Sequence, residues 1–288
     1  MAVPEVTVLD GPMGTELSRR GVALPLPGWS AHALDAAPEM VALVHHEYAL
    51  AGATIHTANT FRTKRRAVGD RWEGMARHAM RLARASIRPE HRLAGSLAPL
   101  EDCYRPDQSP GRSSRSEHRE LARVLADEGA DLLLCETFSA EDEAVVAVEE
   151  AARTGIETWI ALTAGRDGSL MTPRAMAKLA RTCASAGAHA VLVNCTPASD
   201  TLRFVEAIAG STPAFGAYAN AGAPEQGLGW QAEPDGAAAA YARMAQGWIE
   251  AGATIVGGCC GTRPEHIAEL ARIAGALTGR GERRRDRS

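Results

Sequence analysis

Aromatic side chains and surplus positive charge are both scarce in this sequence. Phe, Trp and Tyr make up 5% of the 288 residues, so an aromatic cage around a quaternary ammonium group would be poorly supplied. The formal net charge is −4, and the chain has no large basic field to attract phosphate backbones. The composition therefore disfavours nucleic acid as a partner and favours a small-molecule ligand.

Long hydrophobic runs are absent too. No window approaches the roughly 20 apolar residues that a membrane-spanning helix needs. The N-terminal stretch MAVPEVTVLD lacks the basic and apolar regions of a secretory signal. We therefore expect a cytoplasmic protein that makes no contact with membranes.

Cysteine and lysine are also rare. Six cysteines are too few for a disulfide scaffold in a chain of this length, so a special cysteine is a candidate ligand or nucleophile. The only lysines are Lys64 and Lys178, and neither ends a predicted strand. This disfavours an aldolase or lyase that works through a Schiff-base lysine.

What the sequence does contain is a repeated joint between helix and strand. The joint recurs in the segments LAGATIHTAN, DEGADLLLCET, SAGAHAVLVNC and EAGATIVGGCC, with a glycine at positions 52, 129, 187 and 252. A glycine just past a helix end is the expected left-handed cap, and the apolar run after it is typical of a strand buried on both faces. Each joint therefore predicts a helix followed by a parallel strand.

Four further strands are predicted between these joints, at Val6–Asp10, Arg92–Ala98, Glu157–Thr163 and Pro213–Ala219. Eight alternating strands and helices predict a single (β/α)8 TIM barrel, which we place at residues 1–278. A doubly wound sheet would more often carry G-x-G-x-x-G after its first strand, and LDGPMGTEL has a different spacing. Residues 279–288 are interpreted as a basic, disordered tail.

A long loop follows the third predicted strand. The segment Glu101–Ser116 is rich in proline, serine and charged residues, and loops of this length are usually mobile or functional. We treat it as a candidate lid.

The carboxyl ends of the strands are where a barrel of this kind places its site. Six positions carry suitable side chains there: Asp10, Asn59, Glu136, Asn194–Cys195, Asn220 and Cys259–Cys260. Three thiolates from two strands could hold one tetrahedral Zn²⁺ and leave a fourth position for substrate. The sequence therefore predicts a zinc site at Cys195, Cys259 and Cys260, which are also the residues expected to act in catalysis.

The adjacent cysteines need a special backbone, because neighbouring side chains of a regular strand point to opposite faces. Gly257, Gly258 and Gly261 flank the pair and permit backbone angles closed to other residues. We expect a bent strand end that turns both sulfur atoms toward the barrel axis.

The cysteines also allow interpretations other than a zinc site with an open position. Cys103, Cys135 and Cys183 fit the pattern of small buried hydrophobic residues. A nucleophilic cysteine would want a histidine base, but His266 falls a turn into the last helix. A purely structural zinc site would want a fourth protein ligand, and no further Cys or His ends a strand.

Three thiolates also suggest a chemistry. A zinc ion with this anionic ligand set is a poor Lewis acid, but it can keep a substrate thiol deprotonated near neutral pH. Alkylation of sulfur follows naturally. A thiol amino acid would need acids for its ammonium group, and Asp10 and Glu136 are available, while Gly11 and Gly14 allow close approach to a ligand.

These segments resemble the homocysteine S-methyltransferase family over nearly the whole chain. The motifs that carry the resemblance are LDGPMGTEL, VHHEYALAGATIHTANTF, AGSLAP, LLLCETF, LTAGRDGSLM, VNC, ANAG and GGCCGTRPEHI, in the family's order. The resemblance implies that Cys195, Cys259 and Cys260 bind zinc. It also implies that Glu136, Asp10 and Gly11 hold the amino-acid end of homocysteine. Asn220 matches a position that can approach the metal, whereas His45, His46 and Glu47 match a stretch with no catalytic part.

The chain departs from the family at two positions, and the second bears on the methyl donor. Pro12 stands where members often have a second glycine, so this position has no N–H to donate. Arg62 follows Phe61 where betaine-dependent members have an aromatic residue, which disfavours betaine. The chain also has no appended folate or cobalamin domain. A sulfonium donor, S-methylmethionine or S-adenosylmethionine, is therefore expected.

The sequence thus predicts a zinc-dependent enzyme that moves a methyl group from a sulfonium donor to homocysteine, giving methionine. Three alternatives stay open: another thiol or selenol acceptor, a methyl-corrinoid donor, and a zinc-binding barrel without catalytic activity.

Overall fold

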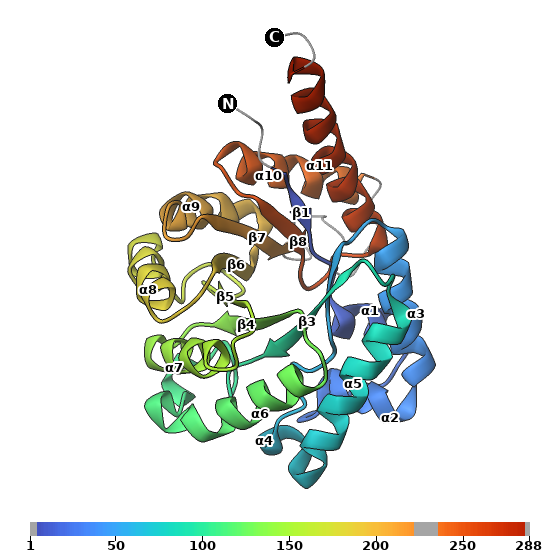
Figure 1. Ribbon diagram of the computed structural model, residues 1–288, viewed down its shortest axis with the longest axis vertical. Helices are drawn as coiled ribbons and strands as arrows, with labels where there is room; N and C mark the ends of the chain where they lie inside the picture. Colours follow the sequence, from blue (N-terminus) through green and yellow to red (C-terminus); the bar gives the residue numbers. More distant parts are fainter. Residues whose placement is uncertain (1–4, 222–235, 286–288) are drawn as a thin grey trace.

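The computed structural model describes residues 5–221 and 236–285, with side chains through residue 276. Its centre is a sheet of parallel strands surrounded by helices (Figure 1). The strands are β1 (Thr7–Val8), β2 (Ile55–Thr57), β3 (Arg92–Leu97), β4 (Leu132–Phe138), β5 (Thr158–Leu162), β6 (Ala190–Pro197), β7 (Ala214–Asn220) and β8 (Ile255–Gly258).

The sheet order is β1-β8-β7-β6-β5-β4-β3-β2, so each strand lies beside its neighbours in the chain and β1 also pairs with β8. Short contacts between β1 and β2 close the ring. Leu9 forms a parallel bridge with Ile55, and the amide of Asp10 donates to the Ile55 carbonyl at 3.0 Å. The predicted (β/α)8 barrel is confirmed.

Helices cover the outside of this barrel (Figure 1). They are α1 (Met13–Arg19), α2 (Ala33–Ala36), α3 (Pro38–Leu50), α4 (Arg65–Val68), α5 (Trp72–Ser86), α6 (Arg115–Asp127), α7 (Glu141–Ala152), α8 (Pro173–Ser185), α9 (Ala198–Ile208), α10 (Ala237–Glu250) and α11 (Pro264–Arg285), with 3-10 turns η1 (Trp29–His32), η2 (Gly69–Arg71), η3 (Pro106–Gln108) and η4 (Gly111–Ser114). Helix α11 continues past residue 278, and the division into a barrel and a tail stays a prediction. None of the helices within the described residues is long and apolar enough to span a bilayer.

The repeated joints behave as their glycines predict. Gly52, Gly129, Gly187 and Gly252 follow α3, α6, α8 and α10, and all four have positive φ angles between 78° and 117°. Glycine adopts this left-handed region without the steric cost that a Cβ atom would add. Each joint therefore turns the chain from a helix back into the next parallel strand.

The core has two layers because the strands are buried on both faces. Along β4, Leu132 and Leu134 pack in one cluster with side chains from other strands, while Leu133 and Cys135 pack in the larger cluster that includes the helices. This alternation follows from the two-residue period of a strand. Cys195, Tyr218 and Cys259 belong to the same cluster as Leu132 and Leu134, which we call the inner cluster, and this sets them at the barrel axis.

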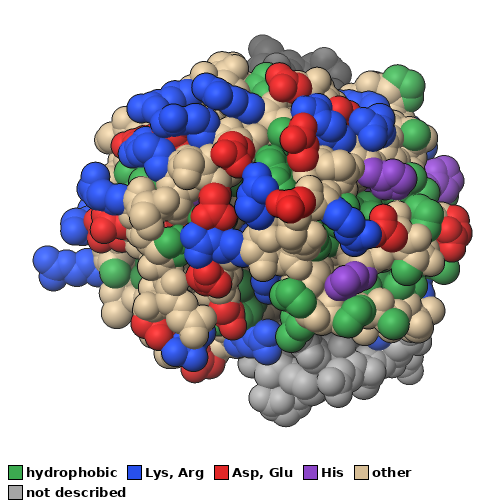
Figure 2. Space-filling model, turned by 90° about the horizontal axis from the view of Figure 1, so that it is seen from below, with side chains coloured by type: hydrophobic (Ala, Val, Ile, Leu, Met, Phe, Trp, Pro, Cys, Tyr) green, Lys and Arg blue, Asp and Glu red, His purple; other side chains and the backbone are tan. Residues whose placement is uncertain are grey.

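The outer surface carries charges of both signs. Figure 2 shows basic and acidic side chains interspersed over the face that it presents. Ion pairs join neighbouring helices, as between Arg77 of α5 and Glu128 at 2.9 Å. Because such pairs are partly exposed, each contributes at most about 1 kcal/mol to stability.

Gly216 marks a place where strands β7 and β8 leave no room for a side chain. It pairs with Ile255, and a Cβ atom added at Gly216 would lie 1.8 Å from the carbonyl oxygen of Ile255. We expect Gly216→Ala to lower the free energy of unfolding by about 3 kcal/mol, because the clash is with backbone. Chemical denaturation measures this.

Gly74 provides the matched control. It lies within α5 and a Cβ atom there would meet nothing within 4 Å. Gly74→Ala should therefore stabilise the protein by about 0.5–1 kcal/mol. Equal stabilities for the two variants would contradict the packing described for β7 and β8.

Candidate active site

A cavity of about 220 Å³ opens at the carboxyl ends of the strands. Residues that follow β1, β2, β3, β5 and β8 line it, together with side chains of β4, β6 and β7. The predicted residues Asp10, Gly11, Glu136, Cys195, Cys259 and Cys260 are all among them. The barrel thus brings residues that are up to 250 positions apart in the chain around one small volume.

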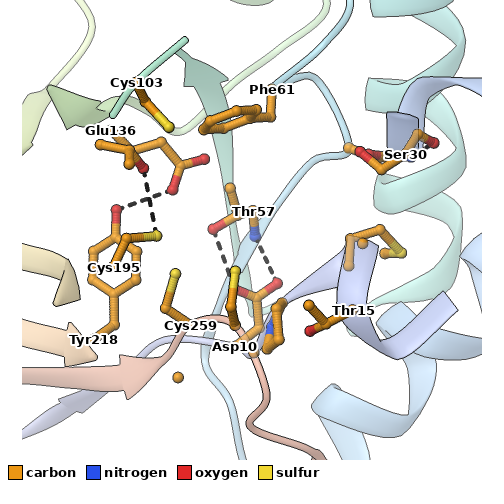
Figure 3. Close-up of a pocket in the computed structure, with 18 of the residues that line it drawn as sticks. Asp10, Thr15, Ser30, Thr57, Phe61, Cys103, Glu136, Cys195, Tyr218 and Cys259 are labelled. Atoms are coloured by element: carbon orange, nitrogen blue, oxygen red, sulfur yellow. Dashed lines mark hydrogen bonds between the residues drawn. The ribbon is translucent and has the colours of Figure 1, made fainter. Parts of the chain in front are cut away.

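The three cysteines converge at one side of this cavity. Cys195 lies in β6, while Cys259 and Cys260 come directly after β8. Their sulfur atoms all lie within 4.8 Å of one another. Figure 3 shows the side chains of Cys195 and Cys259 close together beside Tyr218. Cys195 and Cys259 are buried and Cys260 is partly exposed, so a ligand can reach the group from the cavity.

The adjacent pair converges because the strand has already ended. Strand β8 stops at Gly258, and the carbonyl of Cys259 accepts hydrogen bonds from the amide and hydroxyl of Thr262 at 3.0 and 2.9 Å. Gly261 has the expected positive φ of 82°. In this tight turn, neighbouring side chains do not alternate between two faces as they do in a strand, so both sulfur atoms can face the same cavity.

One expectation about the glycines is wrong. Neither Gly257 nor Gly258 has a positive φ. They are needed for space, because an added Cβ atom would lie 2.6 Å from the Leu9 Cβ at Gly257 and 2.1 Å from the Thr262 Oγ1 at Gly258. Close packing of the turn, rather than unusual backbone angles, excludes larger side chains there.

Cys195 sits in an unfavourable backbone conformation. Its φ is +47°, and the register between β6 and β7 shifts between Asn194 and Pro197. A residue with a side chain in this region costs about 1–3 kcal/mol, which the surrounding structure must offset. The hydroxyl of Thr137 donates to Cys195 Sγ at 3.8 Å and accepts from the side-chain Nδ2 of Asn194 at 2.8 Å. These contacts hold the bulge that turns the thiol inward.

The sulfur atoms titrate as a group. Hydrogen bonds from the other two cysteines lower the pKa of Cys260 well below its ordinary value, and the charge of Arg166 adds to this. Hydrogen bonding within the group, together with burial, raises the pKa of Cys195 and Cys259. The three thiols therefore influence one another's ionisation strongly.

The sulfur geometry fits a zinc ion. Bonds of about 2.3 Å at tetrahedral angles separate sulfur ligands by about 3.8 Å, which is compatible with three atoms within 4.8 Å of one another. Soft thiolate donors are also the ligands that favour zinc over magnesium or calcium. Cys195, Cys259 and Cys260 could therefore hold this metal.

Glu136 lines the same cavity as the adjacent cysteines. Its carboxylate accepts hydrogen bonds from the hydroxyls of Ser96 and Tyr218, the latter at 3.0 Å (Figure 3). Burial raises the pKa of Glu136, and these two hydrogen bonds offset part of the shift. Ser96 and Tyr218 fix the orientation of a carboxylate that is prepared to meet a positively charged group.

Asp10 is the second buried acid. It accepts hydrogen bonds from the Thr57 amide at 2.8 Å and the Thr57 hydroxyl at 3.1 Å (Figure 3). Burial raises the pKa of Asp10 to about 8, against the opposing effect of Thr57, and the charge of Glu136 raises it further. A buried ammonium group beside Asp10 and Glu136 would stabilise their ionised forms.

The glycine after Asp10 is also constrained. A Cβ atom at Gly11 would lie 2.6 Å from the Tyr48 ring, and the Tyr48 hydroxyl donates to the Pro12 carbonyl at 3.2 Å. Gly11 thus lets the loop lie against Tyr48 while it lines the cavity. Gly14 lines the same cavity, where a Cβ would clash with Trp29.

Asn220 is not among the described residues that line the cavity. It is buried at the end of β7, and its Oδ1 has no hydrogen-bond partner in the described part of the chain. The expected approach of Asn220 to the metal stays a prediction. Asn59, the other amide at a strand end, donates from Nδ2 to the Ser30 carbonyl at 2.9 Å and so helps to hold the cavity wall.

Four aromatic side chains gather at this site. Trp29, Phe61, Tyr104 and Tyr218 all line the one small cavity. The expectation that a cage around a quaternary ammonium is poorly supplied, which disfavours betaine, stays a prediction. Composition averages over the chain, whereas folding concentrates these rings from four separate segments.

The residues that hold the acids were also missed from the sequence. Thr57, Ser96 and Tyr218 lie on β2, β3 and β7, at or near the ends that face the cavity. Their positions near predicted strand ends were a usable signal. However, Ser, Thr and Tyr occur at many such positions, and only the inward direction of the side chain distinguishes these three.

A second cluster of polar side chains lies behind the cavity. Ligand atoms of Asp10, His45 and His56 are within 4.8 Å of one another, and all three residues are buried. Burial lowers the pKa of His45 to about 4 and that of His56 to about 3, so both imidazoles are uncharged at neutral pH. The Nε2 of His56 lies 3.0 Å from His91 Nδ1.

Comparisons with known proteins agree with this geometry. A family model described as homocysteine S-methyltransferase matches residues 7–274. Homocysteine S-methyltransferase YbgG of Bacillus subtilis is 33% identical, over 94% of this chain and 95% of that protein. The chain belongs to the homocysteine S-methyltransferase family. The resemblance inferred from the sequence motifs is thus confirmed.

Other members of the family match at similar coverage. A crystal structure of the metallated homocysteine methyltransferase MmuM from Escherichia coli has a TM-score of 0.78 at 26% identity, covering 93% of this chain and 96% of that one. A selenocysteine methyltransferase of Astragalus bisulcatus is 25% identical over 92% of this chain and 91% of its own length. Proteins that this chain resembles are therefore named for different acceptors.

The raised pKa of Asp10 predicts how stability depends on pH. In the unfolded chain Asp10 ionises near pH 3.8, whereas in the folded protein it stays protonated up to about pH 8. Its contribution to stability is therefore present below about pH 4 and is lost as the pH rises toward 8. Relative to Asp10→Asn, the metal-free protein should lose up to about 1.4 kcal/mol per pH unit between about pH 5 and pH 7.

Chemical denaturation of the metal-free proteins across this pH range measures the difference. Asp127→Asn makes the same chemical change at an exposed position on α6 and should give a curve parallel to that of the unmodified protein. A parallel curve for Asp10→Asn as well would show that Asp10 ionises normally in the fold.

Proposed function

We propose that this protein transfers a methyl group from a sulfonium donor to the sulfur atom of homocysteine and so forms methionine, with zinc as its cofactor. The observation that carries the proposal is that three converging cysteine sulfur atoms and two buried carboxyl groups share one cavity. The names of the relatives, homocysteine S-methyltransferase and homocysteine methyltransferase, support the same reaction.

Cys195, Cys259 and Cys260 would hold the zinc ion. When bound there, zinc supplies a positive charge that keeps a substrate thiol in its thiolate form near neutral pH. The three residues provide the rest from the protein side: one strained strand and one tight turn fix the sulfur atoms, and the surrounding inner core excludes water from Cys195 and Cys259.

Asp10 and Glu136 would bind the ammonium group of homocysteine. Both are buried and have raised pKa values, so a cation between them stabilises their ionised forms. Their hydrogen bonds to Thr57, Ser96 and Tyr218 fix the carboxylate orientations before the substrate arrives. Positioning of this kind converts a bimolecular reaction into an effectively intramolecular one.

The methyl donor would bind on the open side of the acceptor. The homocysteine sulfur attacks the methyl carbon of the sulfonium, a new sulfur–carbon bond forms, and the electron pair of the broken bond stays on the departing sulfur. The donor leaves as a neutral thioether, so no proton moves at the reacting carbon. The ring of Phe61 lines the cavity and can stabilise the positive sulfonium.

The size of the cavity favours a compact donor. Its volume of about 220 Å³ lies below the roughly 300–1,000 Å³ that is typical of sites for drug-sized ligands. S-methylmethionine therefore fits the space better than S-adenosylmethionine, which carries a nucleoside.

A cytoplasmic location, and a lid movement of the segment Glu101–Ser116, remain predictions.

A selenol is a second candidate for the methyl acceptor. The similarity to a selenocysteine methyltransferase supports a selenol as an alternative substrate, because a selenol can occupy the same open position among the thiolates. Competition between homocysteine and selenocysteine for the zinc-loaded protein would separate the two.

The reaction itself can be tested directly. Zinc-loaded protein with homocysteine should form methionine with S-methylmethionine, more slowly with S-adenosylmethionine, and not with betaine, as measured by chromatography of the amino acids. Absence of methionine with every sulfonium donor would refute the proposed activity and favour a zinc-binding barrel without turnover.

The zinc ligands can be tested separately from turnover. Replacing any one of Cys195, Cys259 and Cys260 by serine should weaken zinc binding by more than about 100-fold, because a hard hydroxyl replaces a thiolate ligand. Competition with a chromogenic chelator measures the affinity, and methyl transfer should fall in parallel.

Cys183 serves as the control. It is buried on α8 among apolar residues, away from the cavity. Cys183→Ala should keep the zinc affinity unchanged. Full zinc binding by Cys195→Ser would show that β6 does not contribute a ligand.

A further inference from the structure

Among the described residues, one positively charged side chain and several acidic groups line the cavity. Of the described residues that line it, Asp10, Glu136 and the thiolate-forming cysteines carry or can carry negative charge, and Arg166 alone is cationic. Arg166 follows β5 in the segment LTAGRDGSLM and is exposed. It therefore stands at the mouth of the cavity, whereas the two acids lie inside.

The guanidinium of Arg166 is held in place but not neutralised. It stacks over the ring of Tyr104 at 4.7 Å from the centroid. The neighbouring acid, Asp167, instead accepts from the Ser169 amide at 3.0 Å and hydroxyl at 2.7 Å. Within the described part of the chain, Arg166 has no ion pair and no side-chain hydrogen bond, so its N–H donors remain available to a ligand.

The loop that carries Arg166 is ordered by its own hydrogen bonds. The amide of Gly168 donates to the Gly165 carbonyl at 3.2 Å, and the amide of Leu170 donates to the Ala164 carbonyl at 2.9 Å. Gly165 and Gly168 have φ angles of 85° and 72°, which favour glycine. The turn thus presents Arg166 in a defined place rather than on a free chain.

Arg166 also shares the cavity with the sulfur atoms. Arg166, Cys195, Cys259 and Cys260 all line the same volume of about 220 Å³. Tyr104, on which it stacks, packs against the inner cluster that contains Cys195 and Cys259. A molecule bound between the sulfur group and the mouth would therefore extend from the cysteines toward Arg166.

We infer that Arg166, stacked on Tyr104, binds the carboxylate of the sulfonium methyl donor. This rests on the proposed function and specifies its donor as a zwitterionic sulfonium amino acid such as S-methylmethionine. The acids inside the cavity repel a carboxylate, whereas the planar guanidinium can pair with it through two N–H donors. The same positive charge repels the sulfonium end, so the donor is oriented with its methyl groups toward the cysteines.

A comparison of two ligands and two proteins tests the carboxylate contact. The ligands are S-methylmethionine and its carboxamide, which keeps the sulfonium and the ammonium but has no carboxylate. Calorimetric titration of the zinc-loaded protein without homocysteine measures binding alone. Arg166→Gln should weaken binding of S-methylmethionine by about tenfold or more and leave the carboxamide unchanged or slightly tighter.

Two further variants test whether the loss of binding comes from the guanidinium of Arg166. Arg174→Gln removes an exposed arginine on α8 that is not among the residues lining the cavity, and it should change neither dissociation constant. Arg166→Lys keeps the charge without the planar fork and should give an intermediate loss for S-methylmethionine only.

The outcomes separate this inference from the proposed function. Equal weakening of both ligands in Arg166→Gln, no weakening of either, or no binding of S-methylmethionine to the unmodified protein would overturn it. So would a raised KM for homocysteine with an unchanged KM for the donor, since the contact would then belong to the acceptor. Selective binding without any methionine formation would support the contact and refute the proposed reaction.

Discussion

The convergence of three sulfur atoms is the feature on which the rest of the site depends. Cys195 comes from β6, and Cys259 and Cys260 follow β8, so β7 lies between the two sources. The sulfur atoms can meet only because β6 bulges at Cys195 and β8 stops at Gly258. Both distortions are local departures from regular strands, and the regular barrel around them holds each in place.

Burial of negative charge is the second constraint. Burial raises the pKa values of Asp10 and Glu136, and three sulfur atoms converge in the same cavity. The cavity is therefore a poor place for anions and a good one for cations. A metal ion, an ammonium group and a sulfonium all carry the sign of charge that this environment lacks. Arg166 at the mouth provides the complementary charge for a carboxylate.

Much of the fold follows from local sequence patterns. The glycines at 52, 129, 187 and 252 end helices in the left-handed conformation, and the apolar runs after them form buried strands. Because parallel strands end on the same side of a barrel, the side chains that close each run could be assigned to one rim. This assignment placed Asp10, Glu136 and the three cysteines correctly at the cavity. Asn220 lies at the end of β7 as expected, outside the described lining, and its approach to the metal stays a prediction.

The sequence by itself determined the repeated helix–strand units and the residues at their ends, because both depend on neighbours in the chain. Only the tertiary structure decided which side chains face the cavity. The inward direction of Thr57, Ser96 and Tyr218, the gathering of four aromatic rings, and the tight packing that requires Gly257 and Gly258 all arise between segments far apart in the sequence. No local pattern records such contacts, since they exist only once the barrel has closed.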